Sequence, residues 1–363
     1  MHLVMASPNR YIQEPGILKT AGEHIAPIGR KVLLVGDNTT LSVVEPDLYE
    51  SLDRTGLEYK KEVFGGEVTD AETQRIAKLA EDESFDVIAG VGGGKAIDTA
   101  KAAAAFSNRP LVTIPTIAAT CAAWTPLSVF YNEEGAFIRY TVFQNSPRLT
   151  LADTRIIAEA PVRYFNAGIA DTVVKWYEAE ASSAGKNKNI PTVAGLSMAR
   201  LCAETLFEYG IQASRDVEQK KPTEAVQKCI DAIIALSGMV GGLGSDNCRI
   251  AAAHAIHNGF CVLEKTHHLF HGEKVAFATI VQLAMEKRIE DEINKLIDFL
   301  KGIHQPVTLE DMCEGGFTDE ELARVAEASC VPEESIHNMP FTVTPDMVKD
   351  AILEADRLGM GRK

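Results

Sequence analysis

The sequence predicts an N-terminal α/β domain, built on a parallel sheet with one β-hairpin, followed by an all-α C-terminal domain. Up to about residue 150, short apolar strand patterns alternate with helical patterns, which is typical of β-α-β units in a parallel sheet. Beyond residue 150, strand signals nearly vanish and apolar residues recur at helical spacing. We therefore expect domains at residues 1–160 and 161–363, with the boundary near Pro161.

The individual elements are predicted from local signals. Four strand patterns precede the boundary, a buried one at 31–35 and others at 58–64, 85–90 and 110–116. Two β-rich runs around the turn at 132–135 predict the hairpin. Thr39 is expected to cap the helix after the first strand, and Thr69, three residues before Glu72, has the spacing of a capping box. Helices of the second domain are expected at 193–210, 224–244, 249–265 and 274–303.

Composition and charge exclude several classes of protein. The formal net charge of −15 argues against nucleic acid or an anionic membrane as the partner. The seven cysteines are scattered, odd in number and without a C-x-x-C pair, which fits a reducing compartment. We recognise neither a signal peptide nor an apolar run of the ~18–20 residues that a membrane span needs. We expect a soluble, cytoplasmic protein.

A glycine-rich turn follows the predicted strand at 85–90. In Gly90-Val91-Gly92-Gly93-Gly94-Lys95 the missing side chains allow an anion to approach the backbone, and the next helix offers free N–H groups. Neither the G-x-G-x-x-G fingerprint nor the P-loop pattern fits. The alternative is a tight turn without a ligand. Asp37, just past the first strand, can bind an adenine ribose or simply cap a helix.

Histidines are concentrated in the helical domain. His254 and His257 lie three positions apart on one predicted helix, and His271 follows a predicted turn. Asp171 lies in an otherwise apolar helix start. One carboxylate and two imidazoles can form a catalytic metal site with an open position. The alternatives are structural histidines and an Asp171 that serves as a helix N-cap; the H-E-x-x-H zinc pattern is absent.

Six motifs together resemble a known family. GVGGGKAIDTAKA, IPTIAAT, LSVFY, AGIADTVVKWYEA, AAAHAIHNG and HGEKVAF are similar, in order and spacing, to the glycerol dehydrogenase branch of the iron-containing alcohol dehydrogenase superfamily. The similarity covers nearly the whole chain and is weakest after about residue 300. It implies the dehydroquinate synthase-like fold, with the active site in a cleft between the two domains.

The resemblance also assigns roles to residues. It implies that Gly93, Gly94 and Lys95 contact the pyrophosphate of a nicotinamide cofactor and that Asp37 selects NAD. The rest of the cofactor site would be lined by Asp98, Thr116, Thr125, Leu127 and Tyr131. Asp171, His254 and His271 fall on the family's metal ligands, usually zinc in this branch.

Three departures from the glycerol dehydrogenase pattern concern the substrate and the metal. Cys121 stands where those enzymes have an aspartate that faces the polyol, and Trp124 adds bulk nearby. Arg249 lies five residues before His254, where it could bind a carboxylate, or form an ordinary salt bridge. Lys175, four residues after Asp171, could stand beside the metal or replace its charge.

The stretches ATCAAWTPLSV and SGMVGGLG are similar to those of the hydroxycarboxylate dehydrogenases of the same family, which reduce 2-oxoacids such as 2-oxobutanoate. We expect a metal-dependent oxidoreductase that transfers hydride between NAD, with NADP as the alternative, and a small 2-hydroxy or 2-oxo acid. Its catalytic residues would be Asp171, Lys175, His254 and His271. The alternative is glycerol dehydrogenase proper, and the remote alternative is an NAD-using lyase-type synthase of the same fold. We expect one zinc ion and a homo-oligomer.

Overall fold

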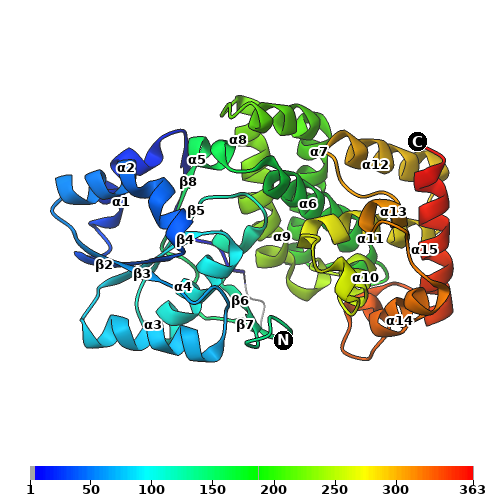
Figure 1. The fold of residues 1–363 in the computed structure, drawn as a ribbon, viewed down its shortest axis with the longest axis horizontal. Helices are drawn as coiled ribbons and strands as arrows, with labels where there is room; N and C mark the ends of the chain where they lie inside the picture. The colour runs from blue at the N-terminus through cyan, green and yellow to red at the C-terminus, as the bar shows by residue number, and fades with distance from the viewer. Residues whose placement is uncertain (1–4, 187, 363) are drawn as a thin grey trace. The chain divides into compact units, whose positions relative to one another are not determined.

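The computed structural model describes residues 5–186 and 188–362 (Figure 1). The chain forms two compact units. The first, the α/β unit, contains residues 6–162 and 215–238, and the second, the helical unit, contains 163–214 and 239–362. The predicted order of a parallel-sheet domain before a helical one is confirmed. Residues 215–238 nevertheless pack with the first unit. The boundary at residue 160 between functional domains stays a prediction.

A six-stranded sheet forms the centre of the α/β unit. Its strand order is β1-β8-β5-β4-β2-β3, and each neighbouring pair is parallel. The strands are β1 (Tyr11–Glu14), β2 (Lys31–Gly36), β3 (Glu58–Val63), β4 (Val87–Gly92), β5 (Leu111–Pro115) and β8 (Leu149–Asp153). Sequence analysis missed β1 and β8. Both are short, and β1 is a strand mainly because it pairs with β8 at the edge of the sheet.

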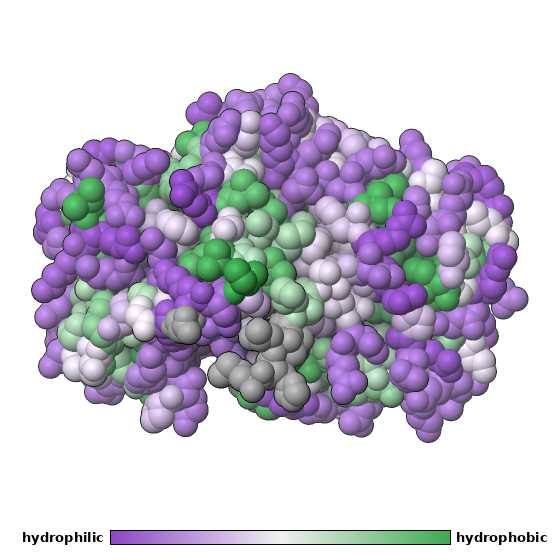
Figure 2. Space-filling view, turned by 180° about the vertical axis from the view of Figure 1, so that it is seen from behind, coloured by the Kyte–Doolittle hydropathy of each residue, from purple (hydrophilic) through white to green (hydrophobic). Residues whose placement is uncertain are grey.

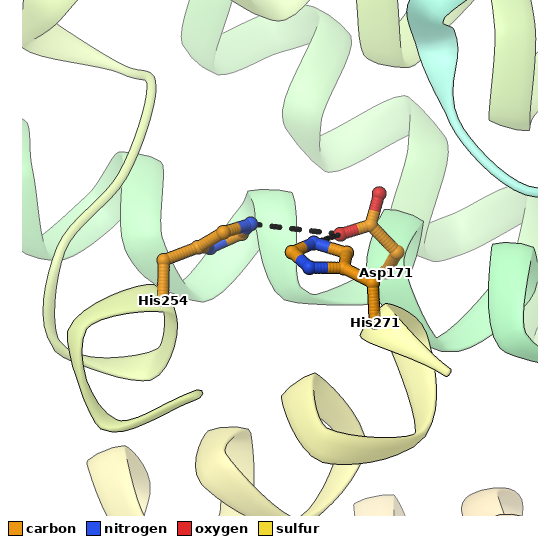
Figure 3. Close-up of side chains that lie close together, drawn as sticks. All are labelled: Asp171, His254 and His271. Carbon is orange, nitrogen blue, oxygen red and sulfur yellow. Dashed lines mark hydrogen bonds and ion pairs between the residues drawn. The ribbon is translucent and has the colours of Figure 1, made fainter. Parts of the chain in front are cut away.

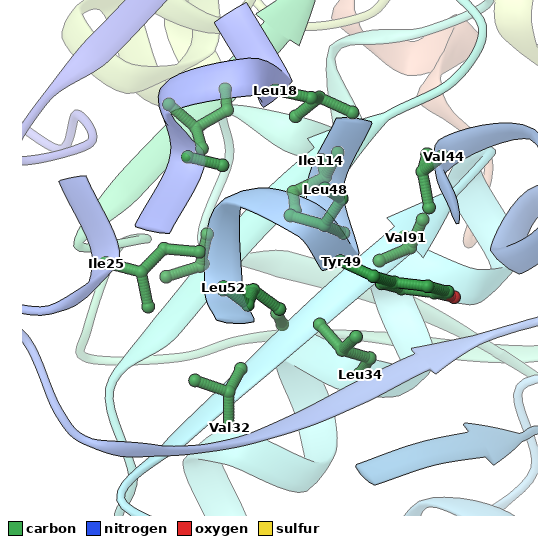
Figure 4. Close-up of a cluster of buried hydrophobic side chains, with 14 of the residues drawn as sticks. Leu18, Ile25, Val32, Leu34, Val44, Leu48, Tyr49, Leu52, Val91 and Ile114 are labelled. Atoms are coloured by element: carbon green, nitrogen blue, oxygen red, sulfur yellow. The ribbon is translucent and has the colours of Figure 1, made fainter. Parts of the chain in front are cut away.

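Side chains of successive strand residues point to opposite faces of the sheet and build two cores. Val32 and Leu34 of β2 join the cluster under helix α2 (Asn38–Arg54), where Figure 4 shows them beside Leu48 and Leu52. Leu33 and Val35 face the other way. They pack with α3 (Asp70–Asp82) and α4 (Gly94–Phe106). Both faces of the sheet are therefore covered, as a parallel sheet requires.

Two predicted helix caps differ in detail from the structure. The cap of α2 is Asp37, whose carboxylate accepts a hydrogen bond from the Thr40 N–H, so Thr39 lies inside the helix. Thr69 caps α3 through the Glu72 N–H, as predicted. Glu72 does not complete the reciprocal half of that capping box, because its carboxylate accepts from Gly65 and binds Arg75.

The predicted hairpin is confirmed as a separate two-stranded sheet. β6 (Leu127–Tyr131) and β7 (Phe137–Val142) are antiparallel. Ser128 holds β6 against α4 by donating to the backbone oxygen of Asp98. The remaining helices of the α/β unit are η1 (Ile17–Thr20), α1 (Ala21–Ile25), η2 (Cys121–Ala123), α5 (Thr154–Glu159), α8 (Glu224–Asp231) and the π-helix η3 (Ala232–Leu236).

The helical unit is built around α6 (Val162–Ser183), α10 (Ala252–Phe260) and α11 (His271–Met285). Two further helices continue from one unit into the other, α7 (Ile190–Glu218) and α9 (Ser237–Gly244). The remaining helices are η4 (Ser245–Asn247), η5 (Glu264–Thr266), α12 (Glu290–Gly302), α13 (Leu309–Met312), α14 (Asp319–Ser329), η6 (Ser335–Asn338) and α15 (Pro345–Met360). Asp171 lies well inside α6, so the interpretation as a helix N-cap was wrong.

One helical stretch is long and apolar enough to cross a membrane. Within the described residues this is Glu224–Asn247, with a mean hydropathy of 1.4, so the sequence expectation that no such run exists was too strict. More than half of the apolar 18-residue segment within this stretch is buried inside the protein, as in a core helix. Hydrophilic residues cover much of the face shown in Figure 2, in keeping with the net charge of −15.

Candidate active site

Three side chains from three helices of the helical unit converge on one point (Figure 3). Asp171 comes from α6, His254 from α10, and His271 is the first residue of α11. The Nε2 atoms of His271 and His254 lie 3.1 Å and 3.5 Å from Asp171 Oδ1. One ligand atom from each residue lies within 4.8 Å of the other two, close enough to hold a single metal ion.

Close helix packing explains why His271 reaches Asp171. A Cβ atom added to Gly272 would lie 1.9 Å from the backbone oxygen of Ala167, so only glycine fits there. The start of α11 therefore lies directly on α6, one turn before Asp171. His254 is brought in by α10, which packs against α11. The exposed fraction rises from 4% for the Asp171 side chain to 14% for His254 and 41% for His271. The site is most accessible beside His271.

Asp171 is the anionic member of the triad, and its neighbours hold it in the charged form. Burial disfavours the Asp171 carboxylate, but Lys175 and the imidazoles of His254 and His271 lower its pKa well below the usual value. Burial disfavours the charged form of His254, yet the carboxylate of Glu178 raises its pKa to about 9. Burial lowers the pKa of His271. One oxygen and two nitrogens are the donor set of a three-ligand catalytic metal site, so the residues present fit a divalent ion.

Two further side chains lie beside the triad, and only one of them was predicted from the sequence. The predicted residue Lys175 has its ammonium 3.8 Å from Asp171 Oδ1, on the same face of α6. Glu178 was missed. It is fully buried and binds His254 Nδ1 at 2.6 Å. Its position seven residues after Asp171, two helical turns along one face, was the available signal. A lone glutamate in an apolar helix does not reveal its partner.

The glycine turn opens α4 at the carboxyl end of β4. Gly92 has φ of 143°, and a Cβ atom on Gly90 would lie 2.8 Å from that of Ala100, so the fold itself requires both glycines. Gly94 differs, because its Cβ atom would come no nearer than 3.7 Å to Thr120 Oγ1. Packing within the protein does not explain the glycine at 94. A ligand at the N-terminus of α4 would explain it.

The other predicted cofactor residues surround the first turns of α4. Lys95 pairs with Glu67 at 2.6 Å and lies 5.5 Å from the centre of the Tyr131 ring. Thr116 follows β5 and donates its N–H to the Gly92 oxygen. Thr125 and Leu127 belong to the segment that leads into and begins β6.

Asp98 is a buried member of this group and supports its neighbours. One carboxylate oxygen binds Lys101 at 2.8 Å, and the other accepts the Val129 N–H at 3.0 Å. Lys101 also donates to the Leu127 oxygen. Asp98 and Lys101 together fix β6 beside the glycine turn. A cofactor role for Asp98 therefore stays a prediction, and its contacts indicate an indirect one.

Asp37 lies at the same edge of the sheet as the glycine turn, because β2 and β4 are neighbours. Thr40 links the two turns by donating its hydroxyl to the Val91 oxygen at 3.1 Å. The helix cap uses one oxygen of Asp37, Oδ1. Capping and recognition of a ribose are compatible functions of one carboxylate.

The three predicted substrate residues have different surroundings. Cys121 begins the short helix η2 and is partly exposed. Trp124 is 5% exposed and packs against Gly238 and the Tyr11 ring. Arg249 belongs to the helical unit and lies 3.7 Å from Asp246, whose side chain is 88% exposed. A substrate carboxylate could replace such an exposed partner at little cost. Their substrate roles stay predictions.

Comparison with known proteins finds a matching family model and relatives that are dehydrogenases or reductases. A family model described as iron-containing alcohol dehydrogenase matches residues 8–154. The chain is 41% identical to a glycolaldehyde reductase of Halobacterium salinarum, over 99% of this chain and 98% of that protein. It is 40% identical to a glycerol dehydrogenase of Thermotoga maritima, over 98% and 97%.

Two further similarities concern another activity and the fold. Hydroxycarboxylate dehydrogenase A of Escherichia coli is 35% identical, over 97% of both chains. The crystal structure of glycerol dehydrogenase from Schizosaccharomyces pombe superposes with a TM-score of 0.91 at 34% identity, covering 99% of this chain and 92% of that one.

Proposed function

The chain belongs to the iron-containing alcohol dehydrogenase family, and from this premise we propose that it interconverts small polyols or hydroxyaldehydes and their oxidised or reduced partners. It is an NAD-linked oxidoreductase of the glycerol dehydrogenase type. The observation that carries the proposal is the Asp171, His254 and His271 triad, whose donor atoms lie within 4.8 Å of one another. The relatives favour this reading over the 2-oxoacid that the sequence motifs suggested. They give no support to a lyase-type synthase.

The residues of the triad would hold one divalent metal. When bound, the metal would supply a Lewis acid that polarises the substrate oxygen, while NAD would supply or accept the hydride. Asp171 would contribute the anionic ligand, because its pKa lies well below the usual value. The greater exposure of His271 supports substrate entry on that side. Gly93, Gly94 and Lys95 would hold the cofactor pyrophosphate at the start of α4.

The substrate class is tested by comparing carbonyl compounds directly. Purified enzyme would be assayed for NADH oxidation with dihydroxyacetone, glycolaldehyde and 2-oxobutanoate at equal concentrations. We expect the two hydroxycarbonyl compounds to be reduced with the higher kcat/KM. A clear preference for 2-oxobutanoate would reject the polyol proposal and leave the family assignment intact.

A 2-oxoacid is the second candidate, and Cys121 and Arg249 favour it. The resemblance places an aspartate at the position of Cys121 in glycerol dehydrogenases, and its loss removes repulsion against an anionic substrate. Arg249 pairs only loosely with Asp246. Arg249→Ala should then raise the KM for 2-oxobutanoate at least about tenfold and leave glycolaldehyde unaffected. Arg200→Ala, which removes an exposed arginine paired with Glu204, is the matched control.

The metal ion is proposed to be zinc. Nitrogen and oxygen donors in a three-ligand site suit zinc, and they also suit iron. Elemental analysis of protein purified without added metal would identify the ion. A role for Lys175 as a charge that replaces the metal would instead require full activity in metal-free protein. Chelation that removes metal and activity together would reject that role.

A homo-oligomer is proposed from the hairpin. The side chains of Phe137, Tyr140 and Val142 on β7 are more than half exposed, and β7 has one partner strand among the described residues. An apolar edge strand favours association with another chain. Light scattering during size-exclusion chromatography should give a mass above 39.4 kDa. A monomeric mass would reject this proposal.

A further inference from the structure

The two histidines of the triad are oriented in the same way. Each turns its Nε2 atom toward Asp171 Oδ1, and each has its Nδ1 atom against a second protein group. An imidazole can bind a metal through Nε2 only when that nitrogen carries no proton. The neighbours of the two Nδ1 atoms therefore decide whether the histidines are ready to bind.

The partner of His254 is the buried carboxylate of Glu178. Oε2 lies 2.6 Å from His254 Nδ1. Oε1 accepts the backbone N–H groups of Ala251 at 2.8 Å and His254 at 3.0 Å, at the start of α10. A carboxylate can only accept, so the hydrogen between Oε2 and Nδ1 belongs on the histidine. Glu178 thus fixes both the N-terminus of α10 and the side chain that α10 contributes to the triad.

The partner of His271 is His257, and a chain of hydrogen bonds fixes its protons too. His271 Nδ1 lies 3.0 Å from His257 Nε2, and His257 Nδ1 lies 2.9 Å from Asn258 Oδ1. The Asn258 amide donates to both carboxylate oxygens of Glu334 at 3.1 Å. Glu334 therefore sets the amide so that Oδ1 faces His257.

One arrangement of hydrogens suits this chain when a cation lies between the two Nε2 atoms and the Asp171 carboxylate, which can only accept. Asn258 Oδ1 accepts from His257 Nδ1, which leaves His257 Nε2 as an acceptor. His257 Nε2 then accepts from His271 Nδ1, which leaves His271 Nε2 free of hydrogen and 3.1 Å from Asp171. Each histidine of the triad is thus linked to a carboxylate. His254 contacts Glu178 directly, and His271 reaches Glu334 through His257 and Asn258.

We propose that Glu178 and the His257–Asn258–Glu334 chain are positioning residues, which hold His254 and His271 in the Nδ1–H form so that both Nε2 atoms face the metal. The proposal rests on the metal centre of the proposed function and deepens it. Partners of this kind raise the affinity of a metal site, and their loss typically weakens metal binding about 10–100-fold. Glu178 should matter more than Asn258, because it acts directly and carries a charge.

The test measures zinc affinity, using Glu178→Gln. A glutamine keeps an oxygen for the two N–H groups of α10, but its amide would donate to His254 Nδ1 and favour a hydrogen on Nε2. We expect the Kd for Zn²⁺, measured against a competing chelator, to rise about 10–100-fold. The NADH Kd should not change, because NAD is proposed to bind the α/β unit. Glu286→Gln, which alters a carboxylate of the helical unit that is 9% exposed, is the matched control and should leave the Kd for Zn²⁺ unchanged.

Asn258→Leu supplies an independent variant if Glu178→Gln fails to fold. It removes the acceptor for His257 on the surface of α10 and should weaken Zn²⁺ binding severalfold, up to about tenfold. Unchanged Zn²⁺ affinity in folded Glu178→Gln, or in Asn258→Leu where the former does not fold, would overturn the positioning role. Wild-type protein that binds no Zn²⁺ would overturn the metal centre itself, so the two failures are distinguishable.

Discussion

The glycine turn and the metal triad are built in opposite ways. The turn from Gly90 to Lys95 is one continuous stretch, and its proposed anion site would consist mainly of backbone N–H groups at the start of α4. The triad consists of side chains 83 and 100 residues apart from Asp171, which only the packing of α6, α10 and α11 brings together. The turn depends on glycines, which have no side chain. The triad depends on three ligand side chains and on the residues that form hydrogen bonds with them.

This difference teaches where each site is vulnerable. A backbone site tolerates any substitution that leaves the N–H groups accessible, and it is blocked by added volume. A side-chain site tolerates no loss of a ligand, and it also depends on the close helix packing that brings its residues together, as at Gly272. The predictions below exploit this contrast, beginning with the largest expected effect.

Asp171→Asn should abolish metal binding by the triad, although the side chain keeps nearly the same volume. The amide lacks the charge that balances a divalent ion, and we expect kcat/KM to fall by about 10³-fold, equivalent to about 4 kcal/mol of transition-state stabilisation. Zinc content and the reduction of glycolaldehyde would both be measured. NADH binding should persist, because the glycine turn belongs to the other unit. Retention of activity within tenfold would show that the triad is not the centre of the chemistry.

Gly94→Ala should damage the cofactor site alone. The new methyl group fits against the protein, with Thr120 Oγ1 at 3.7 Å, and alanine favours a helix over glycine by up to about 1 kcal/mol. We expect the NADH Kd to rise at least tenfold, or about 1.4 kcal/mol, with an undiminished Tm. The comparison is Gly90→Ala, whose methyl group would lie 2.8 Å from the Ala100 Cβ and should lower Tm. Equal NADH affinity in Gly94→Ala would disprove an anion site at this turn.

Asp37→Ser should shift the preference between the two nicotinamide cofactors. Serine preserves an N-cap for α2 but removes the charge that repels a 2′-phosphate. A loss of about 1–2 kcal/mol of repulsion predicts a roughly tenfold gain in kcat/KM for NADPH relative to NADH. Kinetics with both cofactors would show it. An unchanged ratio would mean that Asp37 acts only as a helix cap.

The metal-free protein should show a modest dependence of stability on alkaline pH. Glu178 raises the pKa of His254 to about 9, above the ordinary value of 6.5. A raised folded-state pKa gives stability that is complete below pH 6.5 and is lost as the pH rises through about 9. The Tm of chelated protein should therefore fall between pH 7 and 9.5 more steeply than that of Glu178→Gln. Parallel pH profiles for the two proteins would contradict the ion pair.

The strand and turn patterns of the α/β unit were predictable because their causes are local. The four predicted strands, the hairpin and the Thr69 cap all appear where the sequence indicates them. The strands β1 and β8 were missed. β1 has four residues and none of them is buried, so it lacks an apolar pattern. β8 is buried and as long as β5, so its pattern was available and was overlooked. Thr39 was mistaken for the cap of α2, since Asp37, two residues earlier, competes for the same role.

The triad was predictable only through resemblance to a family. Spacing alone placed His254 and His257 on one helix face and favoured Asp171 as an N-cap. The structure makes His257 a neighbour of His271 and puts Asp171 inside α6. Helical period fixes the face on which a side chain lies, but it does not fix which other helix that face meets.

The sequence by itself determined the fold class, the glycine turn and the types of residue available for chemistry. Each of these depends on residues near one another in the chain, through φ preferences, hydrogen bonds at helix ends and apolar periodicity. Only the tertiary structure decided the partners of Glu178 and His271, whereas Lys101 and Lys175 pair with carboxylates three and four residues away on their own helices. A buried charge must find a counter-charge or hydrogen bond, and the packing of distant helices determines which one is within reach.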